Sequence, residues 1–469
     1  MPIETATTAQ DAAPDTIVAI STPLGRGGIG IVRLSGARAR AIAEPLLKLR
    51  RPLVAGRARV AEILDTDGGG VLDEGVVTFF AGPHSYTAED VVEIAAHGSP
   101  VVLEQVLRQC VAGGARLAEP GEFTERAFLA GRLDLTQAEA VKDLIDASTL
   151  EQARTAARQL GGGLSRLVGP VKQELVELIA GLEAGIDFVE DDLDLMTADV
   201  AAQKIAAIEE PLGRLESTFG YGRILREGFR LAIVGRPNAG KSSLFNRLVG
   251  RDRAIVTAEP GTTRDTVAER MNMAGVPVEL IDTAGLRVGV DEAERLGIAR
   301  SREAMAEADV VVVVVTAGEP VGAEDLEALR AAGSGGRPVF VAINKVDLCG
   351  DVTADTVAEW SLPDGVGAVL TSAVTGVGVE ALKEAVLREL RALPGGGDSA
   401  MLTNLRQHEA VSRAVRALGA ARAAVGVETP HEMVLLDLYE ALEGLDLLTG
   451  GTTNEDVLRL IFSTFCIGK

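Results

Sequence analysis

The chain has 469 residues, of which 47% are hydrophobic and 3% aromatic, and its formal net charge is −22. The length predicts about three domains. A protein that mainly binds phosphate backbones is usually basic, so a nucleic-acid contact of this acidic chain would need a local basic patch or the basic surface of a partner. The chain has three scattered cysteines without a CxxC pair, and it has no apolar run near the ~20 residues that a membrane span needs. Its N-terminus is unlike a signal peptide. These features predict a cytoplasmic protein without disulfides or membrane contact.

Residues 1–130 mix short strand-like runs with turn signals. The runs Thr16–Ile20, Ile29–Leu34 and Val76–Phe80 predict strands. A longer apolar pattern over Val101–Val111 predicts a helix between them. We therefore expect a small α+β domain.

From residue 131 the apolar side chains recur at spacings of three and four, which is typical of amphipathic helices. One helix is predicted from Leu160 to Leu182, and Ile205–Leu215 continues the pattern. Residues 131–222 are therefore expected to form the first part of a helical domain.

Between the two helical stretches, residues 223–392 repeat a pattern of strand, loop and helix. Five apolar runs predict the strands: Leu231–Val234, Val278–Ile281, Val310–Val315, Val339–Ile343 and Ala368–Leu370. Such alternation predicts a mostly parallel, doubly wound sheet covered by helices. The glycine-rich segments Gly220–Gly222 and Pro394–Gly397 mark the edges of this α/β domain.

Helices return after Met401, and residues 393–469 are expected to form the second part of the helical domain. A last helix is predicted to start at Thr452, where Glu455 completes a capping box. The α/β domain is thus predicted to be inserted into a helical domain whose two halves pack together.

A phosphate-binding loop opens the inserted domain. Gly235–Ser242 reads GRPNAGKS, follows a predicted strand and precedes a predicted helix, which is the context that the GxxxxGK[ST] motif requires. Its glycines let backbone N–H groups close around phosphates, Lys241 neutralises the outer phosphates, and the Ser242 hydroxyl binds Mg²⁺. This motif predicts nucleotide binding.

Three further motifs follow in the order that a GTPase needs. Gly261–Asp265 offers Thr263 as a second Mg²⁺ ligand, and Asp282–Gly285 supplies a carboxylate and a glycine N–H for the γ-phosphate. In Asn344–Asp347, the Asp347 carboxylate can accept both the ring N–H and the amino group of guanine, a pair that adenine lacks. Ser372–Ala373 would complete the base pocket through its backbone. The ordered set predicts a Ras-like GTPase.

One position departs from Ras-like enzymes, in which a glutamine follows the glycine of the third motif and orients the attacking water. Here Leu286 occupies that position and cannot hydrogen-bond to water. Glu294 is a candidate for the task, or else a solvated helix carboxylate. Asn238 could help to hold a monovalent cation where an arginine finger would act, or else simply stabilise the loop.

With these residues in hand, the chain closely resembles the MnmE (TrmE) family of tRNA-modification GTPases over nearly its whole length. The resemblance rests on five segments: Gly25–Gly28, Pro120–Phe123, Leu133–Glu139, Gly235–Ser243 and Cys466–Lys469. It implies a homodimer whose N-terminal domain dimerises and binds 5-formyltetrahydrofolate or its methylene form. It also implies an FAD-containing partner, MnmG (GidA), with which the family places a carboxymethylaminomethyl group on carbon 5 of the tRNA wobble uridine, and GTP hydrolysis stimulated by K⁺.

The resemblance also implies roles for individual residues. Folate contacts fall on Arg33, Glu93, Arg132 and Lys469. Potassium is held by the Asn238 side chain and the backbone of Thr257, Glu259 and Thr262. The residues expected to take part in hydrolysis are Glu294, Asn238, Lys241 and Arg287, the last by helping the moving loop. Together with the motifs, this predicts GTP contacts at Asn238, Ala239, Gly240, Lys241, Ser242, Ser243, Thr257, Thr262, Thr263, Asp282, Thr283, Ala284, Gly285, Asn344, Lys345, Asp347, Ser372 and Ala373.

Three other interpretations of the sequence fit it less well or stay open. A ribosome-assembly GTPase without modification chemistry would share every GTP motif, but such proteins usually carry a basic RNA-binding domain. Gly25–Gly30 matches GxGxxG, yet the run after it predicts a strand and not the helix that a dinucleotide site needs. For Cys466 we expect a buried thiol, although its place beside the tail that the resemblance links to folate leaves a catalytic role open.

Overall fold

The computed structural model describes residues 15–187, 197–252, 268–282, 305–334, 336–349, 366–395, 400–427, 429–451 and 455–468. The chain divides into two compact units, one made of Met1–Lys142 with Thr449–Lys469 and the other of Asp143–Leu448. Among the described residues, no helix combines the length and the apolar content that a membrane span requires.

The first unit contains a seven-stranded sheet in the order β3-β4-β5-β6-β2-β1-β7, which is antiparallel except for the parallel pair β1–β7. Its strands are β1 (Ile17–Ile20), β2 (Gly27–Ser35), β3 (Leu47–Leu49), β4 (Ala58–Asp65), β5 (Gly70–Phe80), β6 (Val91–Gly98) and β7 (Arg116–Leu117). Side chains alternate between faces along a strand. In β2 this alternation buries Val32 and Leu34 in the core and places Arg33 on the opposite face.

Helices and the C-terminal tail complete this unit. The helical elements are α1 (Ala39–Ala43), η1 (Glu44–Leu46), α2 (Pro100–Ala112), α3 (Glu122–Leu129), α4 (Leu135–Asp146), which runs on into the second unit, and α16 (Glu455–Ser463). Helix α2 begins at Pro100 and buries Leu103 and Val106 in the core, since both lie on one face at helical spacing. A bridge between Pro120 and Ile467 joins the C-terminal tail to the segment before α3.

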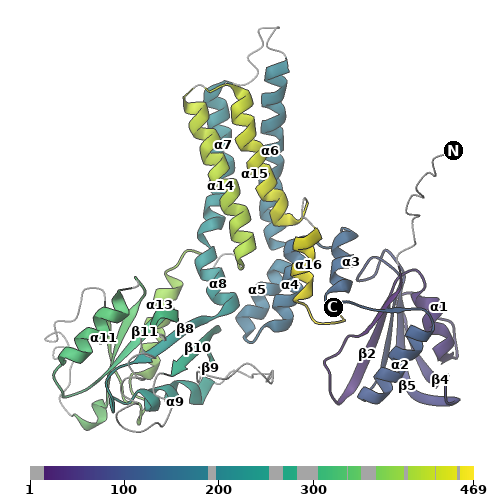
Figure 1. Cartoon of the computed structure of the whole chain (residues 1–469), viewed down its shortest axis with the longest axis horizontal. Helices are drawn as coiled ribbons and strands as arrows, with labels where there is room; N and C mark the ends of the chain where they lie inside the picture. The colour runs from purple at the N-terminus through teal and green to yellow at the C-terminus, as the bar shows by residue number, and fades with distance from the viewer. Residues whose placement is uncertain are drawn as a thin grey trace, which may run out of the picture. The chain divides into compact units, whose positions relative to one another are not determined.

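In the second unit, long helices run side by side as a bundle (Figure 1). They are α6 (Gly163–Asp187), α7 (Ala198–Ser217), α14 (Leu405–Gly426) and α15 (His431–Thr449), preceded by α5 (Leu150–Leu160) and followed, after α7, by α8 (Phe219–Glu227). Side chains from all four long helices share one core, with leucines and isoleucines at spacings of three and four. The two helical halves therefore pack together across the insertion, as the sequence predicts.

The second unit also contains a six-stranded sheet in the order β13-β12-β11-β8-β10-β9. The strands are β8 (Phe229–Val234), β9 (Ala268–Met273), β10 (Val276–Asp282), β11 (Val310–Thr316), β12 (Val339–Asn344) and β13 (Gly367–Leu370). The helical elements are α9 (Lys241–Asp252), α11 (Ala323–Gly333), η3 (Val346–Leu348) and α13 (Val379–Arg391). All strand pairs are parallel except β9–β10, so the predicted doubly wound fold is confirmed.

The structure corrects three local predictions. Leu160 ends α5 and does not begin the next helix, because Gly162 takes a φ of +78° and closes it. Helix α8 runs through Gly220–Gly222, which is therefore not a break; a Cβ on Gly222 would lie 2.0 Å from the Leu402 carbonyl oxygen, so glycine serves a close approach here. Strand β9 was missed. The capping box proposed at Thr452 lies outside the described residues, and the helix after it is described from Glu455.

Candidate functional site

The phosphate loop needs its glycines because it passes close to neighbouring backbone. Gly235, directly after β8, has a φ of +142°, and a Cβ there would lie 2.3 Å from the Val314 carbonyl oxygen of β11. Gly240 has a φ of +96°, and its Cβ would lie 2.1 Å from Nδ2 of Asn344. Any side chain at either position would collide with its neighbour, so the glycine spacing of the motif has a steric cause.

Helix α9 starts at Lys241, at the end of this loop. The Lys241 ammonium donates hydrogen bonds to the carbonyl oxygens of Gly235 (2.8 Å) and Arg236 (2.9 Å). Ser242 and Ser243 are exposed in the first turn of α9, and Asn238 is exposed with a φ of +63°. A helix N-terminus that presents backbone N–H groups beside a lysine is suited to bind phosphate.

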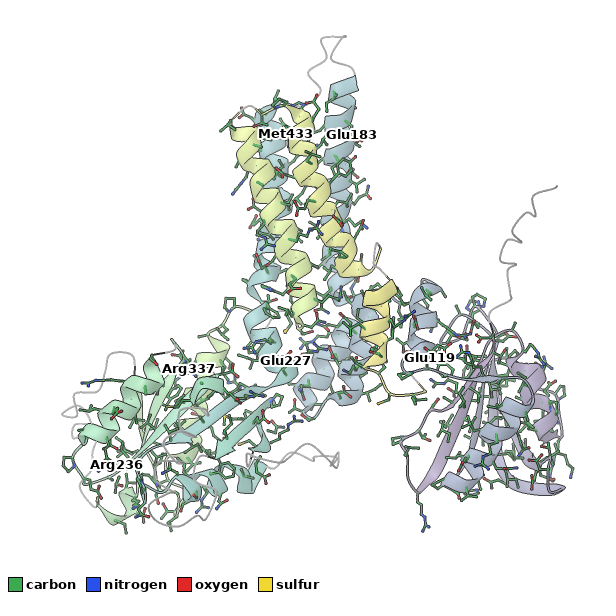
Figure 2. All side chains as sticks on the ribbon, in the orientation of Figure 1. Glu119, Glu183, Glu227, Arg236, Arg337 and Met433 are labelled. Carbon is green, nitrogen blue, oxygen red and sulfur yellow. The ribbon has the colours of Figure 1, made fainter. Side chains whose placement is uncertain are left out.

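The Arg236 side chain, labelled in Figure 2, anchors the loop to the first turn of α11. Its Nε donates to Oδ1 of Asp325 at 2.8 Å, and Asp325 is 1% exposed. The second oxygen of Asp325 accepts the Gly322 N–H at 2.9 Å, at the start of α11. Because the Arg236 carbonyl also accepts a hydrogen bond from Lys241, the ion pair between Arg236 and the buried Asp325 helps to position the lysine. Sequence reasoning missed the pair, since neither residue belongs to a motif that names the other.

On the guanine side, Asn344 connects two loops. The side chain is 1% exposed, donates from Nδ2 to the Ala239 carbonyl (3.0 Å) and accepts the Ala373 N–H at Oδ1 (3.0 Å). It therefore ties the phosphate loop to the Ser372–Ala373 segment. Both loops and the end of β12 lie at the carboxyl edge of the sheet, where open α/β sheets bind their ligands.

The Asp347 carboxylate, which is expected to bind guanine, is exposed, and a hydrogen bond fixes its orientation. Ser372 is buried, and its hydroxyl donates to Oδ1 of Asp347 at 2.5 Å. Lys345 takes a φ of +69°, which turns the chain between Asn344 and Asp347. From α9, Nε of Arg247 donates to the Ala373 carbonyl at 2.8 Å. These hydrogen bonds hold the Asp347 carboxylate and the neighbouring Ser372–Ala373 segment in place, which the motif alone did not reveal.

Part of the predicted site cannot be placed. Asp282 ends β10 at the same edge of the sheet. The other predicted residues lie outside the described part of the chain: Thr257, Glu259, Thr262, Thr263, Thr283, Ala284, Gly285, Leu286, Arg287, Glu294 and Lys469.

Two of the residues expected to contact folate, Arg33 and Glu93, lie on one face of the first sheet. Arg33 and Glu93 are paired across β2 and β6, with Nε of Arg33 2.9 Å from Oε1 of Glu93. The Arg33 guanidinium lies 5.7 Å from the ring centroids of both Tyr86 and Phe123. Burial raises the pKa of the Tyr86 hydroxyl, while its hydrogen bond to Thr124 and the positive charges of Arg33 and Arg132 oppose that rise. Arg132 is exposed.

The C-terminal tail reaches this cluster. The Gly468 carbonyl accepts hydrogen bonds from the Ser21 hydroxyl (3.1 Å) and from Nη1 of Arg33 (3.4 Å). Gly468 has a φ of +95°, and a Cβ there would lie 2.6 Å from the Ile20 carbonyl oxygen, so the tail needs glycine at this position. Residues separated by more than 400 positions therefore form one site, into which sequence reasoning did not place Tyr86, Phe123 or Ser21.

Other predictions have clear outcomes. Cys466 is exposed, so the expectation of a buried thiol is wrong. The C-terminal tail lies on the surface of the first sheet, where the Gly468 carbonyl accepts a hydrogen bond from Ser21. The glycine run Gly25–Gly30 leads into strand β2, as predicted, and no helix starts there. Among the described residues, no group of histidine, cysteine and acidic side chains is arranged to hold a metal ion.

Two family models match the chain. The one described as the GTP-binding protein TrmE N-terminus matches residues 16–132, and the MnmE helical domain matches residues 135–466, more than half of the chain. The chain belongs to the MnmE family of tRNA modification GTPases. Relatives named tRNA modification GTPase MnmE are 55% identical in Koribacter versatilis, 46% in Symbiobacterium thermophilum and 41% in Aquifex aeolicus. Each alignment covers 97% of this chain and at least 99% of the relative.

Membership of the MnmE family confirms the predicted resemblance and the predicted enzyme class, a GTPase of tRNA modification. Among solved structures, the G domain of the T. maritima FeoB iron transporter is 27% identical and covers 34% of this chain and 97% of that chain, with a TM-score of 0.26. An Era variant of Aquifex aeolicus bound to GDP and AlF4⁻ is 28% identical and covers 40% of this chain and 66% of that chain, with a TM-score of 0.28. Scores this low add nothing to the family assignment.

Proposed function

We propose that this MnmE-family GTPase is a cytoplasmic, potassium-stimulated enzyme that acts on tRNA. Together with an FAD-containing MnmG (GidA) partner, it installs a carboxymethylaminomethyl group on carbon 5 of the wobble uridine, with a folate as the one-carbon source. The observation that carries the proposal is the presence of two assembled sites in one chain: braced phosphate and guanine loops on the second sheet, and the Arg33–Glu93 pair beside the tail on the first.

We also propose how the chain is divided among these tasks. Residues 1–130 form the homodimerisation and folate-binding domain. Residues 131–222 and 393–469 form the helical domain, and residues 223–392 form the inserted G domain. The shared core of the four long helices supports joining the two helical segments into one domain.

The loops of the G domain support GTP binding in particular. The Lys241 ammonium would exchange its bonds to loop carbonyls for the outer phosphates. The hydroxyls of Ser242 and Thr263 are oxygen ligands of the kind that Mg²⁺ prefers, and the ion would neutralise phosphate charge. Asp347, oriented by Ser372, would accept the two guanine donors.

Hydrolysis needs a group that orients water and positive charge near the bond that breaks. Leu286 cannot orient water, so we assign that role to Glu294, with Arg287 helping the moving loop. The exposed Asn238 amide, held at a positive φ in the phosphate loop, fits a cation site. Bound there, K⁺ would stabilise the charge that develops between the β- and γ-phosphates. The proposed potassium ligands are Asn238, Thr257, Glu259 and Thr262.

Steady-state hydrolysis in matched KCl and NaCl buffers tests this assignment. We expect turnover of the full chain to be faster in K⁺, and the Asn238→Ala variant to lose that difference while it still binds GTP. Asn246→Ala, an exposed asparagine on α9, is the matched control and should behave as wild type. Equal wild-type rates in the two salts would refute the potassium mechanism and leave the GTPase assignment standing.

The cluster on the first sheet supports folate binding. The glutamate carboxylates of a folate need cationic partners, and the predicted contacts Arg33, Arg132 and Lys469 are cations that lie on or follow this cluster. Calorimetry with 5-formyltetrahydrofolate tests the site. We expect Arg33→Ala and removal of Lys469 each to weaken binding, whereas Arg108→Ala, on the helix α2, should not. Equal affinity in all four proteins would place the folate elsewhere.

A further inference from the structure

Four arginines lie within ten residues at the turn between β3 and β4 (β4 is labelled in Figure 1). We call residues 50–59 the arginine loop; its arginines are Arg50, Arg51, Arg57 and Arg59. The first three are exposed and Arg59 is half-buried. Within the described part of the chain, none of the four is paired with a carboxylate. The loop is thus a concentrated, uncompensated positive charge on a chain whose formal net charge is −22.

Several exposed arginines elsewhere in the described residues are paired with carboxylates. Arg108 binds Glu104, Arg154 binds Glu151, and Arg214 binds Glu210. Even Lys48, just before the loop, is bound to Glu62 at 2.8 Å. Because the chain has many more acidic than basic side chains, four arginines clustered within ten residues and without acidic partners point to a partner outside the chain that supplies the negative charge.

The arginine loop has a fixed backbone. Leu53 is 3% exposed and packs into the core of the first sheet. Gly56, at a φ of +69°, donates its N–H to the Phe79 carbonyl at 2.8 Å, and the Arg57 N–H bonds to the Val54 carbonyl at 3.1 Å. A loop held in this way loses less conformational freedom when it binds than an unstructured basic segment would.

The residue type indicates the chemistry of the ligand. All four cations are arginine, whose planar fork binds two phosphate oxygens at once, whereas lysine acts as a point charge. Within the loop, Val54 is the one large apolar side chain that is exposed, although exposed valines of β4 and β5, Val60 and Val76, lie next to it. The choice of arginine at all four positions therefore favours a ligand rich in phosphate groups.

We propose that the arginine loop binds the phosphate backbone of the tRNA substrate. The inference rests on the proposed function, which makes tRNA the substrate, and it identifies the local basic patch that so acidic a chain would need. Phosphate contacts of this kind position an RNA without reading its sequence, so the loop holds tRNA and leaves recognition of the wobble base to other groups.

Titration of labelled tRNA with the full chain over a range of KCl concentrations tests the proposal. The loop variant is R50Q/R51Q/R57Q/R59Q. The matched control is R108Q/R154Q/R214Q/R413Q, which removes the same charge from arginines that are paired with carboxylates. We expect the loop variant to bind tRNA at least about ten-fold more weakly at low salt, with a salt slope reduced by about one for each lost phosphate contact. The control should bind as wild type, and both variants should hydrolyse GTP at the wild-type rate without tRNA.

Three results would overturn the proposal. Wild-type tRNA affinity in the loop variant would show that this surface is not the contact and would leave the proposed function intact. An equal loss in the control would show that only overall charge matters. Loss of binding to phosphatidylserine–phosphatidylcholine vesicles with tRNA binding unchanged would assign the loop to a membrane. A wild-type chain that hydrolyses GTP but has no affinity for tRNA would instead contradict the proposed function on which the inference rests.

Discussion

Replacing Asn344 by alanine should damage the GTP site through the two loops that this side chain connects. The side chain is 1% exposed and satisfies two backbone groups, the Ala239 carbonyl and the Ala373 N–H. A buried group that loses its partner costs about 1–3 kcal/mol. Two such groups give about 2–6 kcal/mol, shared between the stability of the G domain and the affinity for nucleotide.

If about 2 kcal/mol of this falls on binding, affinity drops about 30-fold. GTP and GDP should weaken by similar factors, because Asn344 fixes the protein loops and not the γ-phosphate. The preference for guanine should persist, since Asp347 is unchanged. Asn344→Asp should be at least as harmful, because a buried carboxylate cannot donate to the Ala239 carbonyl.

Fluorescent GTP and GDP titrations, together with hydrogen exchange of the peptides that contain Ala239 and Ala373, measure both parts of this cost. Asn246→Ala makes the same chemical change at an exposed position of α9 and should leave both readings unchanged. The reasoning is refuted if Asn344→Ala binds both nucleotides as tightly as wild type and protects the two peptides equally well.

Three further outcomes are expected. Asp347→Asn replaces an acceptor by a donor on one side, so competition binding should show XTP displacing GTP; undiminished GTP preference would contradict the role of Asp347. Glu294→Ala should still bind GTP and pair its G domains in K⁺ with GDP and aluminium fluoride, while turnover falls at least ~100-fold, about 2.7 kcal/mol; near-normal turnover would remove Glu294 from the mechanism. Hydrogen bonds from Arg116 and Arg126 hold the pKa of Asp15 low, and in Glu122 hydrogen bonds from Arg116, the Glu119 N–H and Arg126 outweigh the effect of burial, which alone would raise its pKa. Both lowered pKa values stabilise the fold above about pH 4, and this contribution is lost as the pH falls through the folded-state pKa. The thermal unfolding temperature of Glu122→Gln should therefore fall less at low pH than that of wild type. Identical dependence of the unfolding temperature on pH in the two proteins would contradict this.

The pattern of apolar residues predicted most of the fold. Continuous apolar runs such as Val310–Val315 can only be buried strands in this context, and the structure buries them on both faces of the sheet. Strand β9 escaped because Ala268–Met273 is an edge strand whose polar positions hide the alternation that buries Met271 and Met273. Helix α8 was not predicted, because glycine at position 222 usually interrupts a helix. In the structure, the missing side chain of Gly222 instead allows the Leu402 carbonyl to approach the helix closely.

The sequence predicted the loops that form the GTP site, but it did not predict the hydrogen bonds that hold those loops in place. Motif spacing identified Asn344 and Asp347, but the buried bridge of Asn344 and the Arg236–Asp325 pair depend on strands that meet only in the folded sheet. The cluster proposed to bind folate shows the same limit more strongly, because Arg33 meets Gly468 through the C-terminal tail of the chain. Periodicity carries no information on such pairings. The family resemblance grouped Arg33 with Glu93 as folate contacts, but it did not reveal the Arg236–Asp325 pair.

The most direct test of the account is nucleoside mass spectrometry of tRNA from cells that lack this chain, complemented with wild type or with Asp347→Asn. We predict that the C5-modified wobble uridine disappears without the chain, returns with the wild type, and stays low with Asp347→Asn. A wobble-uridine profile that does not change when the chain is removed would contradict the assignment of this GTPase to tRNA wobble modification.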